Sequence, residues 1–269
     1  MMKHVLSIAG TDPSGGAGAA ADCKTFCAHG CFAMNVITAV VSQNTQGVRS
    51  YMDVTPELIA DQIDAVFEDI SVDAVKIGMV SVPVTIRVIA DKLRQYKPPF
   101  TVIDPVMVAT SGHRLLVPEA EDTLKTVLLP LADVLTPNLP EAEVLTGMTI
   151  ETFAQMEEAA KRIAAMGPKA VLVKGGHRME DATDIFYDGH TLHYFKGKRI
   201  ESTSTHGTGC SLSSAIASNL ANGMTLPEAV GAAKEYVFEG IAHAEPIGKG
   251  HGPINHFYKL YKEAGMKNI

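Results

Sequence analysis

The chain has 269 residues, of which 46% are hydrophobic and 20% charged, and its formal net charge is −7. This composition is ordinary for a globular protein and argues against extended disorder. The acidic balance and the lack of a basic stripe argue against a nucleic-acid partner. No apolar run approaches the roughly 18 residues that cross a bilayer, so we expect no membrane partner and a cytoplasmic protein.

Short apolar runs alternate with helical patterns along the whole chain. In chain order we expect the strand HVLSIAG, a helix over residues 17–29, the strand MNVITAVVSQ, a helix over 56–69, the strand AVKIG, a helix over 84–96, the strand TVIDPV and a helix over 119–128. The second half predicts the strand DVLTP, a short helix from Leu139, a helix over 153–166, the strand AVLVKGG, the hairpin DIFYDGHTLHYF and helices over 208–222 and 227–244.

This alternation predicts the fold class. Strands that are apolar throughout are typical of a mainly parallel sheet covered by helices on both faces, which is a three-layer α/β sandwich. No internal repeat, low-complexity tract or linker interrupts the pattern. We therefore predict a single domain over residues 1–269.

Polar and glycine-rich residues fall at the carboxyl end of almost every predicted strand. Ligands bind at this edge in open α/β sheets. We therefore expect one crevice, surrounded by residues that are far apart in the sequence: Asp12, Gln43, Asp104, Asn138 and Lys174.

The segment GTGC, which opens a predicted helix, is the strongest local signal. Gly207 and Gly209 permit a loop in which successive N–H groups point the same way, and the helix start adds partial positive charge. We interpret the segment as an anion hole, with a simple glycine-containing helix cap as the alternative. The helix dipole is expected to lower the thiol pKa of Cys210, which could be a nucleophile, a metal ligand, a buried side chain or a base.

Two carboxylates at the predicted crevice suit Mg²⁺, which prefers oxygen ligands. Asn138 and Glu141 stand three residues apart at a helix start, so a capping box explains them equally well. Asp104 precedes a proline, and a turn-forming role is its alternative.

Three further polar residues have a functional and a structural interpretation. The Gln43 amide could read a heterocycle edge that carries an amine beside a ring nitrogen, or make an ordinary strand-end hydrogen bond. Lys174 could meet a phosphate or be solvated. His206 could be catalytic, although a polar surface role is more common for a histidine in a turn.

Other chemistries are disfavoured. GGAGAAAD matches GxGxxA, but TDPS separates it from the strand and no acidic residue ends a second strand at the expected distance, so nicotinamide or flavin binding is not expected. No Walker A loop occurs in the chain, so any use of ATP would need another architecture. Cys23, Cys27 and Cys31 share a helical spacing without further zinc ligands, so we expect them to pack in the core.

Taken together, the motifs resemble a known family. They run in order as AGTDPSGGAG, ADCKTF, VITAVVSQNTQGV, DAVKIGM, DPVMVATSG, LLPLADVLTPNLPEAEVL, AVLVKGGH, STHGTGCSLSSAIA and GKGHGPINHF. This set is similar to the ribokinase-like vitamin kinases, and closely to the hydroxymethylpyrimidine/phosphomethylpyrimidine kinases of thiamin biosynthesis. The resemblance covers nearly the whole chain.

The resemblance implies a ribokinase-like homodimer that uses ATP and Mg²⁺. It would phosphorylate 4-amino-5-hydroxymethyl-2-methylpyrimidine and then the monophosphate. By motif position, it assigns substrate binding to Gly10, Asp12, Asp22, Gln43, Met79 and Val106. It assigns nucleotide binding to Asn138, Glu141, Lys174 and Thr205, Mg²⁺ to Asp104 and Glu141, the anion hole to Gly207, Thr208 and Gly209, and the base to Cys210.

The chain departs from the family pattern at three places. Ala19 and Ala20 stand where Ile and Gln are common, Cys23 where Leu is common, and Thr110 where Lys is common. The first and third places lie near the substrate lid of the family, so differences are expected in pocket closure.

Three alternatives stay open at this point. A pyridoxal or pyridoxine kinase would use the same scaffold. A thiol hydrolase would use Cys210 with His206, and a non-catalytic pyrimidine-binding protein would use the pocket alone. For a kinase, Cys210 is expected to matter for the alcohol, which must lose a proton, and little for the monophosphate, whose oxygen is already ionised.

Overall fold

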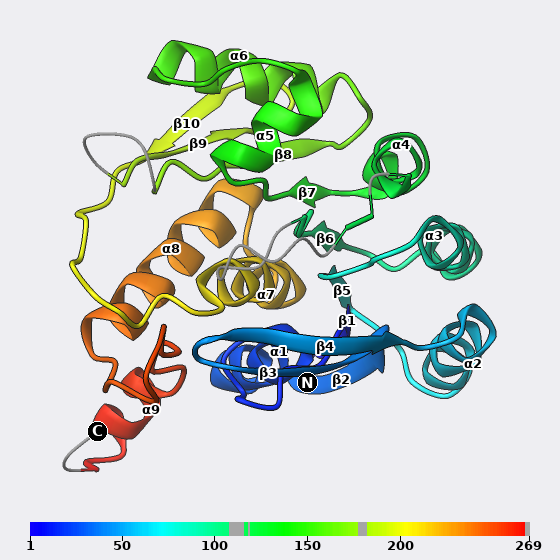
Figure 1. Ribbon diagram of the computed structural model, residues 1–269. Coiled ribbons are helices and arrows are strands. Elements are labelled where there is room, and N and C mark those ends of the chain that lie inside the picture. Colours follow the sequence, from blue (N-terminus) through cyan, green and yellow to red (C-terminus); the bar gives the residue numbers. More distant parts are fainter. Residues whose placement is uncertain (108–115, 118, 177–181, 267–269) are drawn as a thin grey trace.

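The computed structural model describes the chain except residues 108–115, 118, 177–181 and 267–269. At its centre is an eight-stranded sheet with the strand order β10-β9-β8-β7-β6-β5-β1-β2 (Figure 1). Six strands run parallel: β1 (His4–Ala9), β2 (Phe32–Ile37), β5 (Ala74–Ile77), β6 (Thr101–Ile103), β7 (Val134–Leu135) and β8 (Ala170–Val173). The antiparallel hairpin of β9 (Asp184–Tyr187) and β10 (Leu192–Phe195) completes one edge, as the sequence predicts.

Alternating side chains of the strands feed two separate cores, one on each face of the sheet. In β1, Leu6 and Ile8 pack into the first core and Val5 into the second, because successive side chains of a strand point to opposite faces. In β8, Val171 and Leu172 divide in the same way. The central strands are therefore buried on both sides, which explains their uninterrupted apolar sequences.

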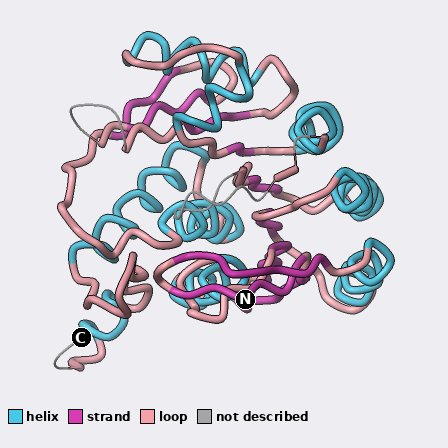
Figure 2. The backbone as a smooth tube through the Cα atoms, viewed as in Figure 1, coloured by secondary structure: helices cyan, strands magenta, loops and turns pink. Residues whose placement is uncertain are grey.

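Helices cover both faces, so the predicted three-layer arrangement is confirmed (Figure 2). One core contains side chains from α2 (Pro56–Phe67), α3 (Pro83–Tyr96), α4 (Ala120–Thr123), α5 (Leu139–Thr146) and α6 (Phe153–Ala164). The other contains side chains from α1 (Gly18–Ala28), α7 (Thr208–Ala221) and α8 (Leu226–Ala242). Helix α7 packs against both α1 and α8. No helix in the described ranges has the length and apolar character needed to cross a membrane.

The segment MNVITAVVSQ does not form the single strand that the sequence predicts. It divides at Thr38 into β2 and β3 (Ala39–Asn44), and β3 pairs with β4 (Gly47–Asp53) in a separate two-stranded sheet. The buried hydroxyl of Thr38 donates to the Met79 carbonyl at 2.8 Å, and this contact accompanies the turn out of the central sheet. Strand β4 was not predicted.

Two other segments differ from prediction. The helix expected over residues 119–128 is α4 followed by a π-helical turn, η1 (Leu124–Leu128), and a short 3₁₀ turn, η2 (Leu129–Leu131). A further helix, α9 (Tyr258–Glu263), was not predicted.

The prediction that all three cysteines near α1 pack in the core is wrong for two of them. Cys31 is 4% exposed and belongs to the second core, whereas Cys23 is half-buried and Cys27 is exposed. The four-residue spacing places Cys23 and Cys27 on successive turns, but α1 presents its core side through Phe26 and its neighbours instead.

Candidate active site

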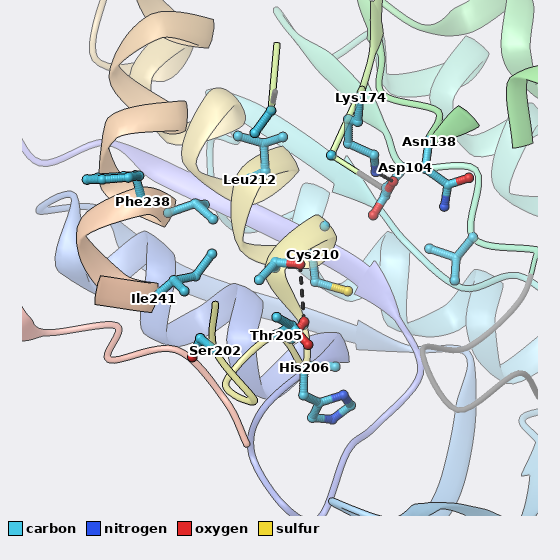
Figure 3. A pocket seen from close by; sticks show the side chains of 18 of the residues that line it. Asp104, Asn138, Lys174, Ser202, Thr205, His206, Cys210, Leu212, Phe238 and Ile241 are labelled. Carbon is cyan, nitrogen blue, oxygen red and sulfur yellow. Dashed lines mark hydrogen bonds and ion pairs between the residues drawn. The ribbon is translucent and has the colours of Figure 1, made fainter. Parts of the chain in front are cut away.

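A cavity of about 740 Å³ lies at the carboxyl ends of the parallel strands, where the sequence predicts a crevice. It brings together almost all of the predicted site residues, although they come from distant parts of the chain. Those that line it are Gly10, Gln43, Met79, Asp104, Val106, Asn138, Glu141, Lys174, Thr205, Gly207, Thr208, Gly209 and Cys210. Figure 3 shows Asp104, Asn138 and Lys174 grouped on one side, Phe238 and Ile241 on the other, and Cys210 between them.

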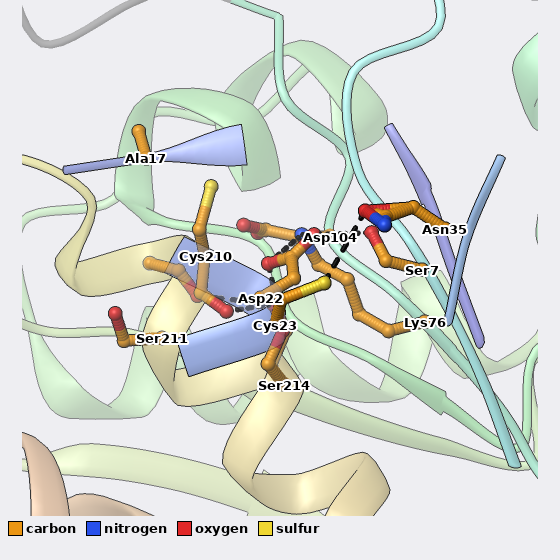
Figure 4. A network of polar contacts seen from close by, with 12 residues as sticks. Ser7, Ala17, Asp22, Cys23, Asn35, Lys76, Asp104, Cys210, Ser211 and Ser214 are labelled. Atoms are coloured by element: carbon orange, nitrogen blue, oxygen red, sulfur yellow. Dashed lines mark hydrogen bonds and ion pairs between the residues drawn. The ribbon is translucent and has the colours of Figure 1, made fainter. Parts of the chain in front are cut away.

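Asp22, which was predicted to bind substrate, lies outside the cavity wall. Its side chain is fully buried, and both carboxylate oxygens lie within 2.9 Å of the Lys76 ammonium (Figure 4). Ser7 on β1 and Ser214 on α7 also donate to this carboxylate, at 2.5 and 2.7 Å. Its carboxylate is thus engaged in interactions within the protein, and Asp22 is not among the residues that line the cavity.

Asp12 also stays outside the cavity wall and organises the loop that follows β1. Its carboxylate accepts hydrogen bonds from the backbone N–H groups of Ser14, Gly16 and Ala17, at 2.8, 3.1 and 2.8 Å. It further accepts from the His206 ring at 2.7 Å. Burial works to raise the pKa of Asp12, but hydrogen bonds from His206, Ser14 and Gln43 outweigh it and hold the pKa well below its usual range.

Asp104 and Lys174 form a buried ion pair after β6 and β8. The Lys174 ammonium donates to Asp104 Oδ1 at 2.9 Å, and Thr136 donates to the same oxygen at 3.2 Å. Burial works to lower the pKa of Lys174, but Asp104 and Glu141 raise it overall, so the ammonium stays charged. A Cβ at Gly209 would lie 3.3 Å from both Asp104 Oδ2 and Lys174 Nζ, so the pair lies against the first turn of α7.

Asn138 and Glu141 form the capping box that the sequence allows. The Asn138 side chain accepts from the Glu141 N–H at 2.9 Å, and Glu141 Oε2 accepts from the Asn138 N–H at 2.8 Å. Glu141 is 5% exposed, and burial raises its pKa to about 7, with Lys174 opposing this shift and Asp104 adding to it. Capping does not remove Glu141 from the cavity wall, so a second role remains open to it.

The GTGC segment forms a tight turn before α7. Gly207 has a φ of 73°, and a Cβ at this position would lie 1.8 Å from the Gly16 carbonyl oxygen, so only glycine fits. No side chain caps the start of α7, and the residues of this start, Gly207 to Cys210, line the cavity. The hydroxyl of Thr208 donates to the Thr205 carbonyl at 3.2 Å and closes the turn.

Cys210 lies in the first turn of α7, but its thiol is not activated as the helix dipole predicts. Burial raises the pKa of this half-buried thiol to about 11. The charge of Lys76 opposes the shift, while those of Asp22 and Asp104 add to it. With its pKa raised, Cys210 is a neutral thiol at neutral pH in the free protein.

The cavity has two apolar walls, and of the residues that form them the sequence predicted only Met79 and Val106. Val41, Val48, Met79 and Val106 surround the region next to Gln43, and Val41 and Met79 belong to a small core of their own. On the opposite side, α7 and α8 contribute Leu212, Val237, Phe238 and Ile241. The apolar patterns of these elements are visible in the sequence, but which side faces a cavity depends on packing.

The predicted metal site is a pair of carboxylates. Within the described residues, no group of three or more His, Cys, Asp or Glu side chains is arranged to hold a metal ion. Asp104 and Glu141 are both buried on the cavity wall and offer oxygen ligands, and Asp104 contributes to the raised pKa of Glu141. Two such carboxylates fit Mg²⁺, which keeps several water ligands and relieves their repulsion.

The positions that depart from the family pattern lie away from this wall or outside the described residues. Ala19 is buried in α1 and Ala20 is half-buried there. Thr110 falls within residues 108–115, which the structure does not describe. The expected difference in pocket closure stays a prediction.

Known proteins are similar to this chain in sequence and in fold. The family model for phosphomethylpyrimidine kinase matches residues 12–255. A hydroxymethylpyrimidine/phosphomethylpyrimidine kinase of Rhizobium meliloti (strain 1021) is 52% identical over 267 residues, which is 98% of this chain and 100% of the relative.

Two solved structures extend the similarity to three dimensions. A phosphomethylpyrimidine kinase from Clostridium difficile 630 has a TM-score of 0.81 at 46% identity and covers 89% of this chain and 99% of its own. An ADP complex of Bacillus subtilis pyridoxal kinase has a TM-score of 0.88 at 36% identity and covers 95% and 98%. The predicted ribokinase-like fold is thus confirmed. The long family match and the close relative together show that the chain is a kinase and belongs to the phosphomethylpyrimidine kinase family.

Proposed function

We propose that the chain phosphorylates the alcohol of 4-amino-5-hydroxymethyl-2-methylpyrimidine with ATP, and then phosphorylates the monophosphate to the pyrophosphate. The observation that carries this proposal is the arrangement of one cavity. Its small apolar region, beside the Gln43 amide, suits a flat ring, and its other region gathers Lys174 and the start of α7. A ring site next to a phosphate site is what this reaction requires.

Gln43 is proposed to read the pyrimidine ring. An amide offers one acceptor and two donors, which match an exocyclic amine and the ring nitrogen beside it. The relatives named for this reaction favour the pyrimidine over pyridoxal, whose ring carries no such amine.

The phosphate region is proposed to stabilise the charge of the transferring phosphoryl group. Phosphoryl transfer requires mainly positioning and electrostatic stabilisation from the protein. Lys174 supplies a buried positive charge, and the N–H groups of Gly207, Thr208 and Gly209 supply donors at the start of α7. Asn138 and Thr205 would contact the nucleotide from the same wall. Asp104 and Glu141 would hold Mg²⁺, which supplies charge neutralisation at the phosphates when it is bound.

Cys210 is proposed to accept the proton of the alcohol. Its side chain lines the cavity at the start of α7, between the group of Asp104 and Lys174 and the side formed by Phe238 and Ile241 (Figure 3). In the second step the nucleophile is a phosphate oxygen that is mostly ionised near neutral pH, since its second pKa is about 6. A base is then unnecessary, so a single cavity serves both steps.

The proposal is tested by measuring ATP consumption with the aminopyrimidine alcohol, its monophosphate and pyridoxal side by side. We expect turnover of the first two substrates, with a kcat/KM for the alcohol at least tenfold above that for pyridoxal. A higher kcat/KM for pyridoxal would contradict the assignment. As a matched variant, Gln43→Met keeps the size of the side chain but removes the amide, and it should lower the preference for the pyrimidine about 10²-fold.

A homodimer in the cytoplasm is also proposed. Val40 and Met52 pair across β3 and β4 and are 52% and 71% exposed, which suits a contact between two copies. Free thiols at all four cysteines suit a reducing compartment. Sedimentation of the protein should give twice the mass of one chain, and Met52→Glu should shift it towards the monomer. A wild-type monomer would contradict the dimer.

A further inference from the structure

His206 and Asp12 are 194 residues apart in the sequence, yet their side chains touch. The His206 Nε2 atom lies 2.7 Å from Asp12 Oδ2, and the two side chains are 14% and 0% exposed. Neither residue was placed in the reaction above. The contact joins the loop after β1 to the turn before α7, and both segments line the cavity, the first through Ala17 and Gly18 and the second through Gly207 and Thr208.

The direction of this hydrogen bond follows from the state of Asp12. Its pKa is held well below the usual range, so the carboxylate is ionised and can only accept hydrogen bonds. His206 must therefore carry its proton on Nε2 and donate it to Asp12. Because Nε2 of His206 carries a proton and donates it to Asp12, this atom cannot remove a proton from Cys210 or from a substrate.

Asp12 connects His206 to the backbone of the loop that follows β1. The same carboxylate binds the N–H groups of Gly16 and Ala17, and Ala17 lines the cavity together with Gly18. The side chain of Gln43, the proposed reader of the ring, also helps to lower the pKa of Asp12. One carboxylate thus ties the ring site and the loop to the histidine.

His206 is held equally firmly on its own side. Its N–H donates to the Gly252 carbonyl at 2.9 Å, and a Cβ at Gly16 would lie 2.5 Å from the imidazole Cδ2 atom. The ring is packed directly on the backbone of the β1 loop. Since His206 immediately precedes Gly207, a shift of the His206 backbone would also shift the proposed anion hole.

We propose that His206 is a positioning residue that, through Asp12, aligns the ring site with the phosphate-binding turn. It does not exchange a proton during the reaction. Misplacement of reacting groups by about 1 Å costs roughly 10²-fold in rate. Both phosphorylation steps use the same turn, so loss of His206 should slow both to a similar extent. This distinguishes it from Cys210, which is proposed to serve the alcohol step alone.

The test compares wild type, His206→Gln and His206→Ala by kcat and KM in single-turnover and steady-state assays of both steps. Glutamine can place an Nε2 donor near Asp12 but cannot act as a base. We expect His206→Gln to stay within about fivefold of wild type and His206→Ala to lose about 10- to 100-fold in kcat for both steps. Equal damage in the two variants, or a loss confined to the alcohol step, would overturn the proposal. Circular dichroism verifies that each variant is folded.

A double-mutant cycle tests the contact itself. If His206 acts through Asp12, Asp12→Asn combined with His206→Ala should lose no more kcat than the worse single variant. If the loss of kcat in the double variant equals the product of the two single losses, the proposal is overturned. If His206→Ala does not fold, the proposal is tested by His206→Gln alone, whose kcat must stay within about fivefold of wild type. This test rests on the proposed function only because it uses the pyrimidine alcohol and its monophosphate as the assayed substrates. If wild type instead phosphorylates pyridoxal, the same ratios of variant to wild type are measured with that alcohol.

Discussion

The ammonium of Lys76 lies 2.8 Å from Asp22 Oδ1 in a region where both side chains are completely shielded from solvent. Burial works to lower the pKa of Lys76, yet the charge of Asp22 raises it overall, so the pair is ionised. The pair connects β5 to α1 (Figure 4). Removing one partner of such a pair leaves an uncompensated buried charge.

Lys76→Met is therefore expected to lower the free energy of unfolding by about 3–5 kcal/mol. Urea denaturation followed by circular dichroism measures this loss. Combining Lys76→Met with Asp22→Asn should recover part of the stability, because no charge is then left unpaired. As a control, Arg162→Gln breaks an exposed pair with Glu158 and should cost less than about 1 kcal/mol. A similar small loss for Lys76→Met would refute the role of the pair.

Cys210 predicts a pH dependence that separates the two phosphorylation steps. With a pKa of about 11, only about one thiol in 10⁴ is ionised at pH 7. If the thiolate accepts the alcohol proton, the logarithm of the single-turnover rate should rise with a slope near 1 between pH 7 and 9. The monophosphate step should stay nearly flat.

The control for this prediction is Cys210→Ala. It should slow the alcohol step about 10²-fold or more and remove its slope, while the monophosphate step changes less than about fivefold. Equal losses in both steps would contradict the assignment of the base.

His256 predicts a loss of stability in acid. It is 5% exposed, its ring lies 3.1 Å from the Ser211 hydroxyl, and burial lowers its pKa from 6.5 to about 4. The unfolded chain therefore binds a proton between pH 6.5 and 4 that the folded protein refuses. Stability contributed at this site is complete above pH 6.5 and falls by up to about 3 kcal/mol as the pH drops to 4.

His256→Gln isolates this contribution in urea denaturation measured from pH 4 to pH 8. The difference between wild type and variant should follow the predicted curve, and a difference that does not vary with pH would refute it. The free energy of unfolding of the variant is subtracted from that of wild type because Glu141 changes stability with pH in the opposite direction. Its pKa is raised in the folded protein, so its protonated form favours folding, and this stabilisation declines as the pH rises from 4.5 to about 7.

Glu141 predicts the response to metal removal. Chelation of divalent cations should abolish turnover, and Glu141→Gln should raise the Mg²⁺ concentration needed for half-maximal activity about 10-fold or more. Glutamine keeps an acceptor for the Asn138 N–H, so the helix cap should survive. Unchanged Mg²⁺ dependence in a folded variant would assign Glu141 to capping alone. The thermal unfolding temperature measures whether the cap is preserved.

Much of the cavity could be predicted from the sequence because many of its polar residues lie close to the carboxyl ends of apolar strands. Asp104, Asn138 and Lys174 follow apolar strands, and parallel strands bring their carboxyl ends to one edge. The errors concern properties that depend on packing. The side of α1 that carries Asp22 is set by its contact with α7, and the thiol pKa of Cys210 is set by burial that no motif encodes.

The division of the segment that forms β2 and β3 is a second feature that depends on packing. MNVITAVVSQ is uniformly suited to a strand, and its division at Thr38 coincides with a contact to the Met79 carbonyl, 41 residues away. The apolar wall from Phe238 and Ile241 was missed because an apolar helix side looks the same whether it meets a core or a ligand.

Because Gln43 stands on the separate β3–β4 sheet, the group proposed to select the ring does not share a structural element with Asp104 and Lys174, which follow strands of the central sheet. Residues of the hairpin can therefore vary without disturbing either main core. In such an architecture, the choice of acceptor can change in evolution while the machinery for transferring the phosphoryl group is inherited intact.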